Sequence, residues 1–392
     1  MATFFDTEIN FESQYPNMGL IALAGAEAFA QKVDEYLVNW YNEEAKKQNR
    51  PFHKDTFLVK TTCPRFTSGD GKALIKDSVR GMDVYIVCDV GNYSITYNMF
   101  GQQVPMSPDD IYADLKRVIC AMGGKAARIS VIMPILYGGR QHRRTARESL
   151  DCAMMLREME TLGVREIITF DAHDPRVQNA APLMGFDNFM PHYQVLKALL
   201  RNFPGLMLDK NHFMCVSPDE GAMFRNIYYA SILGVDLGMF YKRRDYSVVV
   251  NGRNPIVAHE YIGSAVMGMD VFIADDIIAT GESLISLAQH LKQAGANRIF
   301  LCATFALFTE GIDKFRKAHQ EGLFDAVIST NLTYAKPEVL AEPWFIQADM
   351  SKFAAYIVSA CNQDTSVSRL LDPHDKIAEL IDRYNANGLQ LK

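Results

Sequence analysis

Two adjacent carboxylates stand beside a short polar turn in the stretch VFIADDIIATGESLISL, residues 271–287. Asp275 and Asp276 end an apolar run, and residues 279–283 lead into an amphipathic pattern. The unpaired N–H groups of a helix N-terminus favour an anion such as a phosphate. Carboxylates would repel that anion, so they are better suited to accepting hydrogen bonds from sugar hydroxyls or to holding a divalent cation. The alternative is that Ser283 caps the helix and the acids face water.

A second group of chemically suited residues is cationic. Residues 134–151 read PILYGGRQHRRTARESLD and contain four arginines and one glutamine ahead of a helix pattern. Planar guanidinium groups bind phosphate oxygens in pairs, so this segment suits a polyphosphate. The alternative is a solvated charge run at a helix start. The predominance of arginine, directly after the strand-like run 129–134, favours the phosphate interpretation.

Histidine and carboxylates follow two other strand-like runs. Residues 167–178, IITFDAHDPRVQ, place His173 between acids, and residues 216–225, VSPDEGAMFR, contain Asp219. Carboxylate oxygens, with an imidazole nearby, suit Mg²⁺ and its phosphate complexes. A lone histidine is more often structural, so His173 needs support from the other segments.

Two weaker segments complete the set. Residues 238–244, GMFYKRR, have the composition of a basic strand end. Residues 65–81, RFTSGDGKALIKDSVRG, place Phe66 before a glycine-containing turn. Each, taken alone, is explained as well by ordinary structure: a charged strand end, and a surface turn between two strands.

The elements that position these residues can be predicted from hydrophobic periodicity. Short apolar runs alternate with stretches of helical period, which predicts strand–helix–strand units and an α/β fold with a mostly parallel sheet flanked by helices. Residues 149–162 and 283–294 are predicted helices, and 42–54 and 244–262 are predicted surface loops. The predicted strands are 84–88, 129–134, 167–170, 214–216, 237–241, 271–274, 299–305 and 326–329.

Composition narrows the class of protein. The 392 residues are 48% hydrophobic and 22% charged, with a net charge of −6, which does not favour a nucleic-acid partner. No apolar run approaches the roughly 18 residues of a membrane-spanning helix, and the first residues lack the pattern of a signal peptide. The seven cysteines have no metal-like spacing, so we expect reduced, buried thiols in a cytoplasmic protein.

Taken together, these segments resemble the ribose-phosphate pyrophosphokinases of the type I phosphoribosyltransferase superfamily. DDIIATGESL is similar to D-D-x-x-[AD]-T-G-x-[ST]-L, RQHRR to R-Q-D-R-K, FDAHDP to D-L-H-A, SPDEG to S-P-D-x-G, and KRR to D-K-R-R. The resemblance runs from about residue 60 to about residue 360, in the family's order. The chain departs from the family where Ser68–Asp70 replaces Asp-Gly-Glu, and at Ala222 for Gly, His142 for Asp and Tyr241 for Asp.

The resemblance implies a role for each segment. The phosphate turn and carboxylate pair would bind ribose 5-phosphate, the loop after Arg65 and the RQ pair would bind ATP, and the KRR segment would be catalytic. The implied catalytic residues are Lys242 and Arg244; the ATP-binding residues are Phe66, Ser68, Gly69, Asp70, Arg140 and Gln141; the ribose-5-phosphate-binding residues are Arg244, Asp275, Asp276, Ala279, Thr280, Gly281, Glu282 and Ser283; the metal-binding residues, for Mg²⁺, are His173 and Asp219.

The family also implies an organisation. Two phosphoribosyltransferase-like domains related by a pseudo-twofold would comprise residues 1–190, on the ATP side, and 191–349, on the ribose-5-phosphate side, with 350–392 as a candidate addition to the first. The resemblance further implies a homo-oligomer, dimer or hexamer, that uses ATP and ribose 5-phosphate and needs neither nucleic acid nor membrane. Two alternatives stay open: a phosphoribosyltransferase, which Ala279 slightly favours, and a catalytically silent regulatory homologue, which the four departures allow.

Overall fold

The computed structural model describes residues 17–51, 53–244 and 256–387, and within these ranges the side chains of 242–244, 256–259 and 387 are not described. The chain divides into two compact units. The first contains the residues up to Met190 together with Asn331–Tyr334 and Asp349–Asp372. The second contains Pro191–Thr330, Ala335–Ala348 and the residues from Pro373 onward. Residues 350–392 were a candidate addition to the first domain; residues 350–372 belong to the first unit and residues 373–387 to the second.

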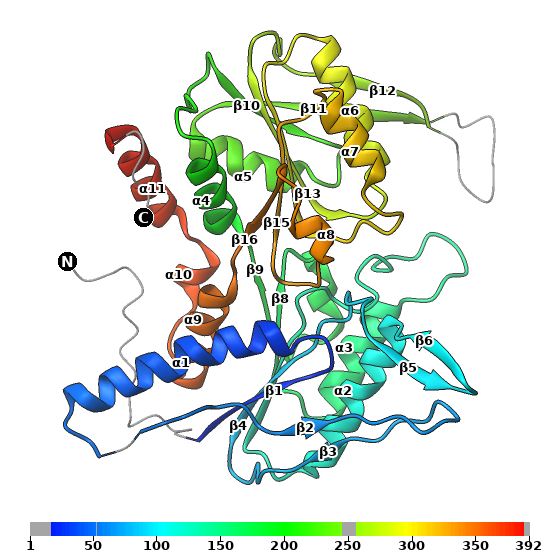
Figure 1. Ribbon diagram of the computed structural model, residues 1–392, viewed down its shortest axis with the longest axis vertical. Helices are drawn as coiled ribbons and strands as arrows, with labels where there is room; N and C mark the ends of the chain where they lie inside the picture. The colour runs from blue at the N-terminus through cyan, green and yellow to red at the C-terminus, as the bar shows by residue number, and fades with distance from the viewer. Residues whose placement is uncertain (1–16, 52, 245–255, 388–392) are drawn as a thin grey trace. The chain divides into compact units, whose positions relative to one another are not determined.

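The first unit is built on a five-stranded sheet in the order β1-β4-β7-β8-β9, and every neighbouring pair is parallel (Figure 1). Two short antiparallel ribbons, β2–β3 and β5–β6, lie outside this sheet. The strands are β1 Met18–Ala22, β2 Thr61–Thr62, β3 Leu74–Ile75, β4 Asp83–Val87, β5 Thr96–Met99, β6 Gln102–Pro105, β7 Arg128–Ile132, β8 Glu166–Phe170 and β9 Gly185–Phe189. The helices are α1 Glu27–Lys47, α2 Pro108–Met122, α3 Asp151–Thr161, the 3₁₀ helix η1 Pro175–Ala180, α9 Ser351–Asn362 and α10 Ser368–Leu371.

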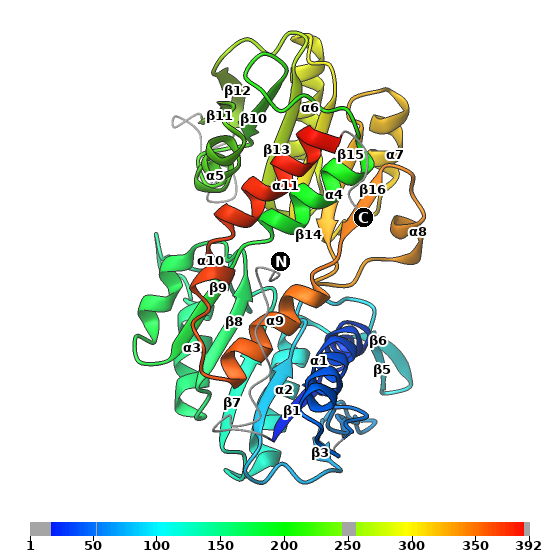
Figure 2. The same ribbon diagram turned by 90° about the vertical axis from the view of Figure 1, so that its left-hand side faces the viewer.

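Helices pack on this sheet through one apolar face each. The buried residues of α2 and α3 form a continuous core with alternate residues of β4, β7 and β8. Helix α2 begins with a reciprocal capping box between Ser107 and Asp110 and ends at Gly123 in the left-handed conformation. Helix α9 lies beside α1 (Figure 2), and its Phe353 contacts Phe189 at the end of β9.

The second unit is built on a seven-stranded sheet in the order β12-β11-β10-β13-β14-β15-β16. All pairs are parallel except β11–β12. The strands are β10 Phe213–Ser217, β11 Asp236–Arg244, β12 Ile256–Ile262, β13 Asp270–Ile278, β14 Ile299–Ala306, β15 Ala326–Thr330 and β16 Phe345–Ala348. The helices are α4 His192–Asn202, α5 Met223–Leu233, α6 Glu282–Gln293, α7 Asp313–Gln320, α8 Pro337–Leu340 and α11 His374–Asn387.

The predicted α/β class, with a mostly parallel sheet in each half, is confirmed. The loop prediction for 244–262 is wrong at its end, because β12 pairs there with β11 in an antiparallel arrangement. The loop prediction for 42–54 is also wrong at its start, since α1 continues to Lys47. The thiols are not uniformly buried: Cys120 is exposed, because it lies on the outer face of α2.

No helix in the described part of the chain combines the length and the apolar character that crossing a membrane requires.

Candidate functional site

In the second sheet, the order in which successive strands are added reverses at one position, between β10 and β13. Strand β10 pairs with β11 on one side and with β13 on the other, and the later strands are added only beyond β13. In open α/β sheets, ligands bind at the carboxyl ends of the strands that flank such a switch point. The loop after β10 contains Asp219, and the carboxyl end of β13 carries Asp275 and Asp276, so the sheet order brings the predicted residues to one place.

The carboxylate pair lies inside β13, not after it. The sequence predicts a strand end at residue 274, but pairing with β14 continues: Asp275 lies opposite Ala303, and Ile278 lies opposite Ala306. Asp276 is buried, with 7% of its surface exposed, so the alternative that both acids face water is wrong. Burial, followed by the charge of Asp276, raises the pKa of Asp275 to about 7.

The turn after β13 leaves the start of α6 without a side-chain cap. The helix begins at Glu282, its N-cap is Gly281 with φ 80°, and no side chain accepts a capping hydrogen bond. The alternative in which Ser283 caps this helix is therefore wrong. The N–H groups of the first turn and the positive end of the helix dipole remain suited to an anion.

The carboxylate of Glu282 lies in this turn by sequence, but its side chain is held elsewhere. Lys314, on α7, donates a hydrogen bond to Glu282 and a second one, of 2.7 Å, to Glu310. The side chain of Glu282 is 65% exposed. Within the turn, the Glu282 N–H points to the hydroxyl oxygen of Thr280 at 3.5 Å, a long contact. The turn also bonds to the neighbouring strand end, because Thr309 N–H donates to the Ala279 carbonyl at 2.9 Å.

Asp219 shapes the loop between β10 and α5. Its carboxylate accepts a hydrogen bond from the Ala222 N–H at 3.1 Å, and its carbonyl accepts one from the Ser217 hydroxyl at 2.7 Å. Arg225, near the start of α5, lies 3.9 Å from the Asp275 carboxylate. The charges of Asp219 and Asp276 both raise the pKa of Asp275, which indicates a concentration of negative charge that a cation would relieve.

Asn226 joins this loop to β13 and is not among the predicted site residues. The side chain is fully buried; its amide group donates to the Ala274 carbonyl at 2.7 Å and accepts from the Ala274 N–H at 3.1 Å. These bonds continue the sheet ladder past the last β10–β13 pair, Val216 with Ile273. Asn226 therefore fixes the backbone directly before Asp275. No pattern in the sequence singles out Asn226.

The predicted catalytic residues Lys242 and Arg244 lie at the end of β11, where Lys242 is in register with His259 of β12. Their side chains fall outside the described residues, as does the backbone of 245–255. Their catalytic role stays a prediction.

In the first unit, the predicted adenine loop is a tight turn with an exposed ring. The Phe66 N–H donates to the Asp70 carbonyl at 2.7 Å, and the Ser68 hydroxyl donates to the Asp70 carboxylate at 2.7 Å. Gly69 has φ 96°, a left-handed conformation that suits glycine. Phe66 is 53% exposed, and the ammonium group of Lys72 lies 5.5 Å from its ring centroid. An exposed aromatic ring on a braced turn can stack on a base.

The cationic segment and the histidine follow neighbouring strands of the first sheet. Arg140 is exposed in the loop after β7, and the side-chain amide of Gln141 donates to the Ser149 carbonyl at 3.0 Å. His173 follows β8 and is exposed, with its ring centroid 5.2 Å from that of His142. Between strand and histidine, Asp171 is buried with φ 45°, an uncommon conformation outside glycine.

His142 replaces an aspartate of the family pattern and is not among the predicted site residues, but it lies in the same cluster as His173. Its Nε2 lies 3.6 Å from the Asp174 carboxylate, and the pKa of Asp174 is lowered to about 2, first by its hydrogen bond with Arg176. Desolvation, then the proximity of His173, lowers the pKa of His142. The sequence places each histidine after a predicted strand, 129–134 or 167–170, and the structure shows that these two strands pair.

Comparison with known proteins gives two family matches. Residues 18–163 match the N-terminal domain of ribose phosphate pyrophosphokinase, and residues 193–324 match the phosphoribosyl transferase domain. Among curated proteins, the ribose-phosphate pyrophosphokinase of Vibrio cholerae is 28% identical over 319 residues, covering 80% of this chain and 92% of that protein. The Shewanella oneidensis protein of the same name is 29% identical over 310 residues, covering 78% and 89%.

The fold is similar to that of a solved structure. A phosphoribosylpyrophosphate synthetase from Mycobacterium smegmatis superposes with a TM-score of 0.68 at 19% identity, covering 89% of this chain and 99% of that chain. At this identity the likeness supports the fold. The family assignment rests on the two family matches and the sequence relatives.

Proposed function

The chain belongs to the ribose-phosphate pyrophosphokinase family, and we propose on that premise that it transfers the diphosphoryl group of ATP to the anomeric hydroxyl of ribose 5-phosphate. The products are phosphoribosyl pyrophosphate and AMP. The observation that best supports this proposal is the carboxyl end of β13, where a carboxylate pair within the strand is followed directly by an uncapped helix N-terminus. A sugar phosphate needs both features.

The turn 279–283 holds the 5-phosphate of the sugar. Gly281 allows the backbone to approach the ligand closely, and the hydroxyls of Thr280 and Ser283 add donors. Asp275 and Asp276 accept hydrogen bonds from the ribose hydroxyls. The contact between Lys314 and Glu282 supports this assignment, because it draws the one carboxylate of the turn toward α7.

ATP is held by residues of the first unit. Phe66 supplies a stacking face for adenine, and Ser68, Gly69 and Asp70 form the turn that supports it. Arg140 and Gln141 bind the phosphates.

The reaction is an in-line displacement at the β-phosphorus of ATP, so the protein mainly positions the reactants and neutralises charge. Lys242 and Arg244 stabilise the charge that develops on the transferring group. The clustered carboxylates around Asp275 fit a hard cation. Asp219 in the second unit and His173 in the first are the residues that we propose for binding Mg²⁺, which would neutralise phosphate charge.

The proposal is tested by incubating the purified chain with ATP and Mg²⁺, with and without ribose 5-phosphate, and measuring AMP. Release of AMP that depends on the sugar supports the proposal. A chain that releases no AMP alone but co-purifies with an active synthetase would be the regulatory homologue. A chain that instead consumes phosphoribosyl pyrophosphate in the presence of a nucleobase would be a phosphoribosyltransferase.

Lys242→Ala tests the catalytic assignment in the same assay. Removing a transition-state cation from a phosphoryl-transfer site costs roughly 10³-fold in turnover, while binding of ribose 5-phosphate changes little. Lys317→Ala is the matched control, because Lys317 is an exposed residue of α7 with 78% of its side chain accessible. Near-normal turnover of Lys242→Ala would remove that residue from the mechanism.

A further inference from the structure

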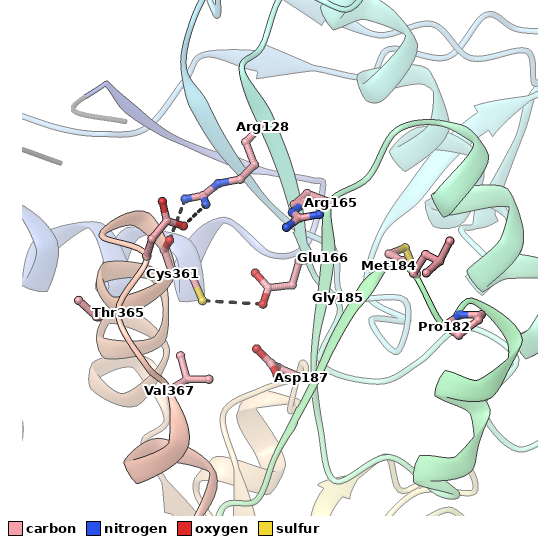
Figure 3. A pocket seen from close by; sticks show the side chains of 12 residues that line it. Arg128, Arg165, Glu166, Pro182, Met184, Gly185, Asp187, Cys361, Thr365 and Val367 are labelled. Carbon is pink, nitrogen blue, oxygen red and sulfur yellow. Dashed lines mark hydrogen bonds and ion pairs between the residues drawn. The ribbon is translucent and has the colours of Figure 1, made fainter. Parts of the chain in front are cut away.

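The first unit contains a cavity at the amino-terminal ends of strands β7, β8 and β9. The cavity measures about 520 Å³, and Arg128, Glu166, Asp187, Cys361 and Asp364 are among the residues that line it (Figure 3). Glu166 is the first residue of β8, whereas His173 follows the other end of that strand. Strand β8 has five residues, so its two ends are about 16 Å apart.

Three side chains in this cavity have donor atoms that converge. A carboxylate oxygen of Glu166, a carboxylate oxygen of Asp187 and the Sγ of Cys361 all lie within 4.8 Å of one another. Figure 3 shows the two carboxylates and the thiol directed toward a common point, with Sγ 4.0 Å from the nearer oxygen of Glu166. The three residues come from three separate segments: β8, β9 and the last turn of α9.

The fold explains this convergence. In the parallel register Glu166 lies opposite Gly185, so Asp187, two residues later, projects from the same face of the sheet as Glu166. Helix α9 covers that face, because Phe353 packs on Phe189 of β9. Cys361 lies eight residues after Phe353, on the same side of α9, and therefore reaches the sheet above the two carboxylates.

Arg128, a cation that lines the cavity, donates hydrogen bonds to several other residues. It donates to both oxygens of Asp83 at 2.8 and 2.7 Å, to Asp364 at 2.6 Å and to the Cys361 carbonyl at 2.7 Å. Burial, followed by the contact with Asp187, raises the pKa of Glu166 to about 8, although the charge of Arg128 acts in the opposite direction. Burial also raises the pKa of the Cys361 thiol.

We propose that Glu166, Asp187 and Cys361 bind a transition-metal dication, with Zn²⁺ preferred, at this edge of the first sheet. A thiolate with two carboxylate oxygens is a borderline-soft donor set, which favours Zn²⁺ over Mg²⁺. Bond lengths of about 2.0–2.3 Å place tetrahedral ligands roughly 3.5 Å apart, so the side chains close by about 1 Å on binding. Three protein ligands would leave one position of a tetrahedral ion for water.

Binding has two consequences for the chain. The thiolate and the ionised carboxylates are the forms that bind a metal, so affinity rises with pH. The metal also joins α9 to β8 and β9, and it should stabilise the first unit against unfolding. Neither consequence depends on the activity proposed above.

Cobalt titration of the full chain tests the site. The protein is stripped with a chelator, supplied with excess Mg²⁺ to fill oxygen-only sites, and titrated with Co²⁺. We expect one Co²⁺ per chain, with a thiolate-to-cobalt charge-transfer band in the near ultraviolet and visible bands of tetrahedral cobalt, all displaced by one equivalent of Zn²⁺. Cys361→Ser should abolish the charge-transfer band, and Asp187→Asn should weaken binding at least tenfold.

Cys120→Ser is the matched control, since Cys120 is an exposed thiol on α2, and it should bind like the wild type. Zn²⁺ should raise the melting temperature of the wild type and of Cys120→Ser but not of Cys361→Ser. Circular dichroism shows whether each variant is folded; if Cys361→Ser is not, the comparison is made with Asp187→Asn. The proposal is overturned by a folded wild type that shows no band, by an unchanged band in Cys361→Ser, or by cobalt bound without thiolate charge transfer.

Discussion

Replacing Gly281 by alanine would put a methyl group into the aromatic cluster beneath the phosphate turn. The Cβ of alanine at this position would lie 2.2 Å from two ring carbons of Phe315, far inside van der Waals contact. Phe315 is fully buried; its ring is stacked on Trp344, with centroids 5.9 Å apart, and packs edge-to-face with Phe308 at 4.9 Å. The ring is enclosed by these neighbours, so the turn itself has to move.

The cost has two parts that can be separated. A left-handed conformation costs an alanine about 1 kcal/mol relative to glycine, and overpacking a core typically costs about 1–3 kcal/mol. We therefore expect Gly281→Ala to lower the free energy of unfolding of the second unit by about 2–4 kcal/mol. Gly311→Ala supplies the matched control, because Gly311 has φ 81° and no atom within 4 Å of an added Cβ. It should cost only about 1 kcal/mol.

Trp344 is a fluorescence probe of this cluster. The chain has two tryptophans, so in a Trp40→Phe background Trp344 reports alone on the packing around Phe315. Urea unfolding followed by its emission should give a lower midpoint for Gly281→Ala than for Gly311→Ala. The Michaelis constant for ribose 5-phosphate should also rise at least tenfold in Gly281→Ala only, because the turn is displaced. Equal losses in the two variants would refute the steric argument and leave only backbone strain.

Two further predictions concern the support and the ionisation of the carboxylate pair. Asn226→Ala leaves the N–H and carbonyl of Ala274 without their buried partners. At about 1–3 kcal/mol per group, the loss should lower the free energy of unfolding in urea by about 2–6 kcal/mol. A loss below about 1 kcal/mol would show that the ladder extension is unimportant. Because the pKa of Asp275 is raised to about 7, its ionised, hydrogen-bond-accepting form is gained as the pH rises through neutrality, so the Michaelis constant for ribose 5-phosphate should fall between about pH 6 and pH 8. Asp275→Asn retains the titration of the substrate phosphate but should lose this additional dependence, and identical pH profiles for the two proteins would contradict the assignment.

The strands and the chemistry-bearing segments could be predicted from the sequence because they are local properties. Apolar runs such as 271–274 and 299–305 define buried parallel strands by composition alone. Gly281 at a strand–helix junction identifies a turn that needs a left-handed residue. The family resemblance also depends only on local segments and their order along the chain: RQ, SPD, KRR and DD.

Strand ends and side-chain partners depended on the tertiary structure. Asp275 and Asp276 belong to β13 because β14 extends the ladder to Ala306, a long-range pairing that the local polarity of the acids hides. The role of Lys314 in withdrawing Glu282 also requires α7 to pack beside α6. In each case the deciding contact joins segments about 30 residues apart.

The difference between local patterns and long-range contacts also explains why the sequence predicted one group of candidate site residues and not the other. The turn that we propose binds the sugar phosphate lies within 17 consecutive residues, 271–287, so a local pattern was enough to predict it. The Glu166–Asp187–Cys361 group is assembled from residues up to 195 positions apart, and none of the three stands in a recognisable motif. Only the parallel register of β8 and β9, with α9 laid across the same face, brings those donor atoms together, and sheet order and helix placement are properties that no local pattern contains.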